Sequence, residues 1–183
     1  MASSEIAAAG KDHCLEQCDG CCCQRYTVLV TTFDVQRILE NLPAVRPRDF
    51  TVFYPSSIDP SGDFPRILLR GAWYCLGMAF SSRGACIWHT KEGRCAIHHF
   101  SPLVCQAYPW TLDTEDSIIF NPDAICQAVF APREPGVTKA VVQQSWNESQ
   151  RYAELVERWN AGPGRNREMR RKDFLTFCGC RCL

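Results

Sequence analysis

The sequence has no net charge and no long apolar segment. Its 183 residues carry 20 basic and 20 acidic side chains, so overall charge gives no reason to expect nucleic acid or an anionic membrane as a partner. No apolar run approaches the ~20 residues that a membrane-spanning helix needs. The start, Met1–Ile6, lacks the basic residues and apolar centre of a secretory signal. We therefore expect a cytoplasmic protein with no nucleic-acid partner and no membrane span.

Cysteine, in contrast, is abundant. The chain has 13 cysteines, an odd number, and Cys21, Cys22 and Cys23 are consecutive. Thiols stay reduced in the cytoplasm, where clustered cysteines bind metal or carry out redox chemistry more often than they form disulfides. The composition therefore predicts a metal-binding protein rather than a disulfide framework.

Local patterns predict an α+β fold: a small, irregular, cysteine-rich domain with short strands and a long C-terminal helix. The β-branched and aromatic run at residues 26–30 predicts a strand. The next apolar residues recur at helical spacing, with Thr32 as the expected cap and Pro43 as the stop. Apolar residues on one helical face predict a single helix over about residues 138–160.

We expect three parts: a flexible N-terminal lead, a cysteine-cluster domain that includes the long helix, and a basic tail that contains cysteines. Their ranges are residues 1–12, 13–161 and 162–183. The tail closes on Cys178, Cys180 and Cys182, which suit a labile metal or redox site, a lipid attachment point or a solvated end. Lipidation is disfavoured, because Arg181 is not the aliphatic residue that a prenylation signal carries at that place.

Two sets of cysteines are the candidate metal ligands. The first set is Cys14, Cys18, Cys21 and Cys22, and the second is Cys86, Cys95, Cys105 and Cys126. Thiolate suits zinc and iron–sulfur clusters, but a single structural zinc usually shows two separated Cys-x2-Cys pairs. The adjacent side chains of Cys21 and Cys22 diverge, which suits two irons of one cluster, or two sites, better than one ion. An iron–sulfur cluster, with 4Fe–4S favoured, is therefore preferred to zinc, and the spacing leaves open whether the sets mix.

Other residues near these cysteines have simpler interpretations. The four histidines, His13, His89, His98 and His99, are expected to surround the ligands or lie on the surface rather than to ligate metal. Cys23 and Cys75 are expected to pack as small apolar side chains.

The order of the cysteines resembles the YkgJ-type cysteine-cluster family, to which zinc or iron chelation is attributed. The family opens with Cys…Cys-Gly-x-Cys-Cys, an aliphatic strand and a Thr-x-x-Asp helix start, which Thr31 and Asp34 match. Its second block has counterparts here in Gly84, Cys86, Cys95, Ile97, Pro102, Cys105, Tyr108 and Pro109, with Cys126 following. The resemblance spans about residues 13–127. The chain has His98, Ser101 and Gln106 where the family more often has Tyr, Arg and Arg.

The sequence leaves two classes of function open. One is a metal-binding protein that acts in electron transfer or iron handling, with a redox partner. The other is an iron–sulfur-dependent enzyme: a resemblance to flagellin lysine methylases implies a protein lysine N-methyltransferase that uses S-adenosylmethionine on a protein substrate. The Cys14-x3-Cys18-x2-Cys21 spacing is also that of radical S-adenosylmethionine enzymes. The chain is, however, short for a barrel of ~250 residues and lacks a Gly-rich cofactor motif.

Overall fold

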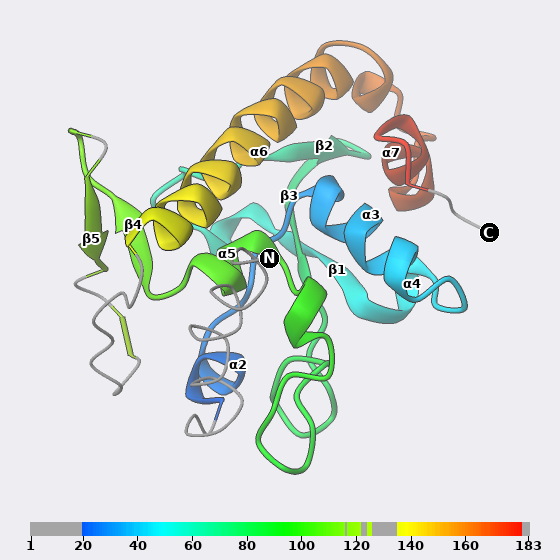
Figure 1. The fold of residues 1–183 in the computed structure, drawn as a ribbon. Coiled ribbons are helices and arrows are strands. Elements are labelled where there is room, and N and C mark those ends of the chain that lie inside the picture. Colours follow the sequence, from blue (N-terminus) through cyan, green and yellow to red (C-terminus); the bar gives the residue numbers. More distant parts are fainter. Residues whose placement is uncertain (1–19, 116, 122–123, 126–134, 181–183) are drawn as a thin grey trace. The chain divides into compact units, whose positions relative to one another are not determined.

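The computed structural model describes residues 20–115, 117–121, 124–125 and 135–180, with the side chains of 135–137 excepted (Figure 1). The described helices are α2 (Cys21–Arg25), α3 (Thr32–Asn41), α4 (Pro47–Phe50), α5 (Leu103–Ala107), α6 (Pro135–Ala161) and α7 (Arg171–Phe177). The strands are β1 (Thr51–Pro55), β2 (Ile67–Leu69), β3 (Ala72–Met78), β4 (Trp110–Leu112) and β5 (Ile118–Phe120). The predicted α+β class, with short antiparallel strands and a long helix near the C-terminus, is confirmed.

The chain divides into two compact units, each built from segments far apart in sequence. Unit 1 takes its described residues from 20–26 and 80–146, and unit 2 from 27–79 and 147–180. Helix α6 contributes its first part to unit 1 and the remainder to unit 2.

Unit 2 is built on an antiparallel sheet with the strand order β1-β3-β2. The central strand, β3, pairs with β1 from Thr51↔Met78 onward and with β2 from Ile67↔Tyr74 onward. Because β2 covers only part of that edge of β3, residues 28–30 pair with the remainder through a single bridge, Leu29↔Gly77. The strand expected at residues 26–30 is therefore reduced to this bridge.

The core of unit 2 joins the sheet to four helices. The fully buried side chains include Val35 and Ile38 of α3, Phe50 of α4, Ile67 and Leu76 of the sheet, Tyr152 and Trp159 of α6, and Phe174 of α7. The Phe174 ring packs edge-on against Phe53 at 6.0 Å and against Trp159 at 5.3 Å between centroids. Each such side chain contributes about 1.5–3 kcal/mol by leaving water, so α7 is an integral part of the unit.

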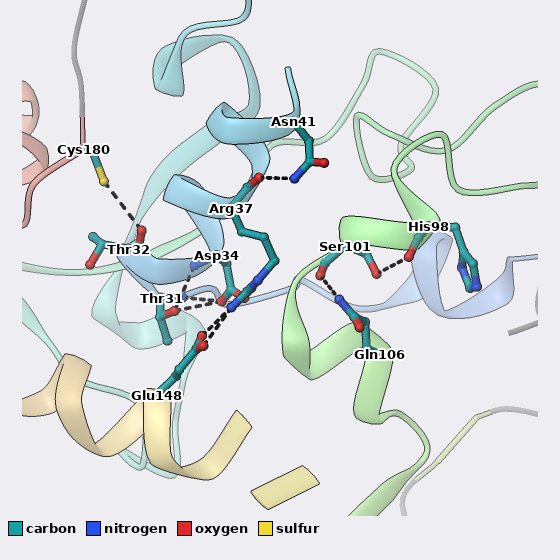
Figure 2. Close-up of polar contacts among 10 residues, drawn as sticks. All are labelled: Thr31, Thr32, Asp34, Arg37, Asn41, His98, Ser101, Gln106, Glu148 and Cys180. Atoms are coloured by element: carbon teal, nitrogen blue, oxygen red, sulfur yellow. Dashed lines mark hydrogen bonds and ion pairs between the residues drawn. The ribbon is translucent and has the colours of Figure 1, made fainter. Parts of the chain in front are cut away.

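Helix α3 begins at a capping box formed by Thr31 and Asp34, and Thr31, rather than the expected Thr32, is the cap. The Asp34 amide donates to Thr31 Oγ1 at 3.2 Å, and both the amide and the hydroxyl of Thr31 donate to Asp34 Oδ2 at 2.9 Å. One turn later, Arg37 donates to Asp34 Oδ1 at 2.7 Å and to both carboxylate oxygens of Glu148 on α6 at 2.7 and 2.9 Å (Figure 2). Arg37 therefore joins α3 to α6 within unit 2.

Two adjacent side chains of α6 form hydrogen bonds with backbone groups at the outer edge of β2. The indole nitrogen of Trp159 donates to the Leu68 carbonyl at 2.9 Å, and the Leu68 amide donates to Asn160 Oδ1 at 2.8 Å. The Asn160 amide nitrogen donates to the Arg66 carbonyl at 2.8 Å. An edge strand otherwise presents unpaired backbone groups, so these three bonds close the sheet with a helix.

Unit 1 is poorer in regular structure. It contains α2, an irregular loop over residues 80–100, α5 and the two-stranded sheet of β4 and β5. The entry to α5 is ordered by Ser101, whose hydroxyl donates to the His98 carbonyl at 3.0 Å and whose carbonyl accepts from Gln106 Nε2 at 2.6 Å (Figure 2). The described cysteines of unit 1 therefore lie on short loops and helices rather than on an extended sheet.

Candidate metal centre

The short helix α2 presents three consecutive thiols. It follows Gly20, whose φ of 69° lies in the left-handed region that glycine adopts without strain. The Cys86 amide donates to the Cys23 carbonyl at 2.7 Å. Because this bond joins backbone segments 63 positions apart, α2 lies directly against the loop that carries Cys86.

The loop at residues 80–100 presents Cys86 and Cys95. Bridges Phe80↔Cys86 and His89↔Cys95 fold the loop back on itself, and the Ala96 amide donates to the Trp88 carbonyl at 2.8 Å. The loop is therefore held by isolated bridges rather than by a continuous ladder. Its effect is to hold the two cysteines, nine positions apart, in the same small loop.

Four thiols of unit 1, Cys22, Cys23, Cys86 and Cys95, lie close enough to shift one another's protonation; we call them the thiol cluster. Burial, followed by the charges of Cys86 and Cys22, raises the pKa of Cys95 to about 11. Burial and then the charge of Cys22 raise the pKa of Cys86. A hydrogen bond with Cys22 is the largest cause that raises the pKa of Cys23, ahead of burial and the charges of the other three thiols.

These shifts indicate what the thiol cluster can bind. Burial is the largest cause of the raised pKa of Cys86 and of Cys95, so a thiolate at either position is unfavourable in the absence of a cation. A cation held among the thiols reverses that preference, because coordination deprotonates a thiol outright. The donors are soft sulfur atoms, which suit zinc or iron and not magnesium or calcium.

Cys21 faces a different neighbour from Cys22 and Cys23. Its thiol donates to the Ile125 carbonyl at 3.6 Å, and the Ile125 amide donates to the Tyr26 hydroxyl at 3.2 Å. The next residue in sequence is Cys126 of the second predicted set. Cys21 therefore lies next to the segment that leads to Cys126.

His89 adds a nitrogen to the same loop. Its Nε2 atom is buried and has no hydrogen-bond partner among the residues that the structure describes. A Cβ built on Gly20 would lie 2.7 Å from this atom, so the imidazole packs against the backbone at the start of α2. A buried polar atom normally finds a partner, and imidazole is a ligand for zinc and iron. Together with the sulfur donors, the residues present fit such a metal in chemistry.

The predicted ligands are distributed as follows. The charge of Cys22, from the first set, affects the pKa of Cys86 and Cys95, from the second set, so members of the two sets lie near one another. Cys105 lies exposed on α5. Cys14, Cys18 and Cys126 lie outside the described residues. In the part of the chain that is described, no three His, Cys, Asp or Glu side chains are arranged to hold a metal ion. Sequence reasoning passed over Cys23, although the consecutive thiols of α2 were a signal that it shares their surroundings.

The thiols of the tail belong to unit 2. Cys178 and Cys180 are buried, and burial raises the pKa of Cys178 to about 11. The Cys178 carbonyl accepts from Gln36 Nε2 at 2.8 Å, and the Cys180 thiol donates to the Thr32 carbonyl at 3.6 Å (Figure 2 shows Cys180 and Thr32). These two cysteines are therefore packed against α3 rather than solvated, whereas Cys182 lies outside the described residues.

A family model, CxxCxxCC, whose description reads "Putative zinc- or iron-chelating domain", matches residues 13–127. The chain belongs to this family. The CxxCxxCC match spans both predicted sets of cysteines and all four members of the thiol cluster, and it confirms the resemblance found in the sequence. Membership of this family supports the chelation of zinc or iron.

No curated protein and no solved structure matches the chain. Among the described residues, no helix combines the length and apolarity that crossing a bilayer requires.

Proposed function

We propose that this protein holds zinc or iron in unit 1, at a centre built on the thiol cluster. The observation that carries the proposal is the hydrogen bond from the Cys86 amide to the Cys23 carbonyl at 2.7 Å, which holds α2 against the loop at residues 80–100 within the stretch that the family model matches. The further ligands are those that the sequence predicts: Cys14, Cys18, Cys21, Cys105 and Cys126. A reducing, cytoplasmic location suits this role, since no disulfide joins any of the nine cysteines that are described.

We favour an iron–sulfur cluster that serves electron transfer or iron handling. Four thiols at one place match the ligand count of a 4Fe–4S cluster, although a four-cysteine zinc site has the same count. The divergence of Cys21 from Cys22 is the feature that favours iron, because several metal atoms accept ligands from neighbouring residues more easily than one ion does.

Metal analysis of the chain purified without oxygen tests this proposal. An iron–sulfur cluster gives broad absorbance near ~400 nm and inorganic sulfide equal to iron. A colourless protein with stoichiometric zinc would overturn the cluster and electron transfer but keep metal binding. A folded chain that is free of both metals, and that takes up neither, would overturn metal binding itself.

Substitution of single thiols tests the ligand assignment. We expect Cys22→Ala and Cys95→Ala each to weaken metal binding at least ~10-fold, because each removes a thiolate that the folded site supplies. Cys75→Ala is the matched control: Cys75 is a buried thiol on β3 of unit 2, and its loss should leave the metal content unchanged. Full metal content in both cluster variants would show that the ligands lie elsewhere.

A further inference from the structure

A second surface, in unit 2 and remote in sequence from the cysteines of α2, has the composition of an anion site. The turn between β2 and β3 and the start of α7 border a pocket of about 480 Å³, and Figure 1 shows β2 ending beside α7. This volume lies in the range of small-molecule pockets. The lining residues, called here the basic pocket, are Leu69, Arg70, Tyr74, Met169, Arg170, Arg171 and Lys172.

The backbone of Arg70 is strained where it borders the basic pocket. Leu69 pairs with Ala72, so Arg70 and Gly71 form a two-residue hairpin turn, with φ of 55° and 83°. Such turns prefer Asn or Gly at the first position, since a left-handed conformation is unfavourable for most side chains. Strain of this kind persists mainly where the residue serves a function. The presence of arginine at this position therefore indicates a use for its guanidinium group.

Among the described residues, the three arginines of the basic pocket take part in no ion pair. The ion pairs of arginine involve Arg37, Arg46 and Arg48, and none involves Arg70, Arg170 or Arg171. Asp173, which follows Lys172 in sequence, accepts from the Arg170 backbone amide at 2.7 Å.

The orientation of one of these cations is set by packing. The Arg171 guanidinium lies 5.7 Å from the centre of the Phe53 ring, a cation–π distance that orders the side chain without removing its charge. Gly71 brings a further cation close, since a Cβ there would lie 3.7 Å from Nε of Arg167.

The remaining walls of the basic pocket are apolar or aromatic, from Leu69, Tyr74 and Met169. Guanidinium groups bind phosphate oxygens in paired, charge-assisted hydrogen bonds. Inorganic phosphate alone would make no apolar contact with these three side chains. We infer that the basic pocket binds a small organic phosphate monoester, with the phosphate at the arginines and an apolar or aromatic body against Leu69, Tyr74 and Met169.

Calorimetric titration of the full-length, metal-loaded chain tests this inference with three probes: phenyl phosphate, inorganic phosphate and phenol. Phenyl phosphate should bind most tightly, inorganic phosphate more weakly and phenol not at all. Because charged groups are screened by salt, phenyl phosphate should bind more weakly in 0.5 M salt than in about 0.05 M. Equal binding of phenyl and inorganic phosphate would overturn the organic part of the inference, and no binding of either would overturn the whole.

Arg70→Asn is the decisive variant, because asparagine suits the turn and removes the cation. We expect phenyl phosphate binding to fall at least ~10-fold, the loss expected for one charge-assisted contact, while the melting temperature stays equal or rises. Arg170→Gln should weaken binding similarly. Arg48→Gln, which removes an exposed arginine of α4 outside the pocket, should change neither quantity. Binding that survives Arg70→Asn and Arg170→Gln would place the anion elsewhere, such as on the metal of unit 1, and would overturn the inference.

Discussion

Arg37 forms ion pairs with two largely buried carboxylates of unit 2. Its guanidinium is shared between Asp34 and Glu148, and the exposed fractions of the three side chains are 21%, 5% and 14%. Burial by itself would lower the pKa of Arg37, but hydrogen bonds to Glu148 and the charge of Asp34 outweigh it, so the pKa is raised. The arginine is thus held charged in a place where its loss would leave a buried carboxylate without its counter-charge.

We expect Arg37→Ala to lower the free energy of unfolding by about 2–4 kcal/mol, the cost of leaving one partner of a buried ion pair alone. Urea denaturation measures this, with Arg46→Ala as the control, because the Arg46–Asp49 pair is exposed and lies at 3.4 Å. The control should unfold at the same urea concentration as the unchanged chain. If the two variants unfold alike, the Arg37 ion pairs do not stabilise unit 2.

The residues around Arg37 also show what the sequence could and could not reveal. Thr31 and Thr32 are both suitable caps, and the choice between them depends on Asp34, which stands three positions after Thr31 as a capping box requires. That signal was available. The partner of Arg37 was not, because Glu148 lies 111 positions away and no local pattern links the two.

At the scale of elements, the attachment of α6 to β2 depends on one short side chain. Asn160 accepts from the Leu68 amide and donates to the Arg66 carbonyl. We expect Asn160→Ala to lower the free energy of unfolding by about 1–3 kcal/mol, because it leaves these backbone groups unpaired. Hydrogen exchange at the Leu68 amide should become faster. Glu157→Ala, an exposed change on the same helix, is the control and should leave that amide protected.

An unchanged exchange rate of the Leu68 amide in the Asn160→Ala variant would mean that α6 does not protect the edge of β2.

The helix itself was predictable: apolar periodicity indicated residues 138–160, and the structure has Pro135–Ala161. Its position on β2 was not, since Asn160 carries no periodic signal. The strand predicted at residues 26–30 is reduced to a single bridge, because β2 already occupies part of the edge of β3 with which it would pair. The sequence of residues 26–30 contains no information about that edge.

At the scale of the whole molecule, the sequence predicted the family from its cysteine pattern, but it did not predict the division of the chain into two units. The order of the cysteines predicted the family that the match over residues 13–127 shows. It could not predict that Phe174 of α7 packs in the core of unit 2, because its contact with Phe53 of β1 joins residues that are 121 positions apart.

The same division predicts an uneven response to metal removal. The thiol cluster belongs to unit 1, so a chelator should speed hydrogen exchange over residues 80–100 while residues 150–160 of unit 2 keep their protection, because metal binding contributes free energy only to the structure that holds it. Mass spectrometry of peptides from both ranges measures this. The Cys75→Ala variant is the control for the loss of a thiol that does not bind metal. Its unit 2 peptides should exchange at the same rate with and without chelator. Equal loss of protection in both units would place the metal in a structure common to the two.

The packing of Phe174 against Phe53 of β1 has a consequence for biosynthesis. Phe53 leaves the ribosome well before its packing partner Phe174, which is synthesised 121 residues later. At about 5–20 residues per second, translation of the intervening stretch takes roughly 6–30 seconds. During that interval the nascent chain carries an unfinished apolar surface beside reduced thiols. The core of unit 2 can therefore close only after α7 has been synthesised, and until then its apolar surface depends on chaperones for protection.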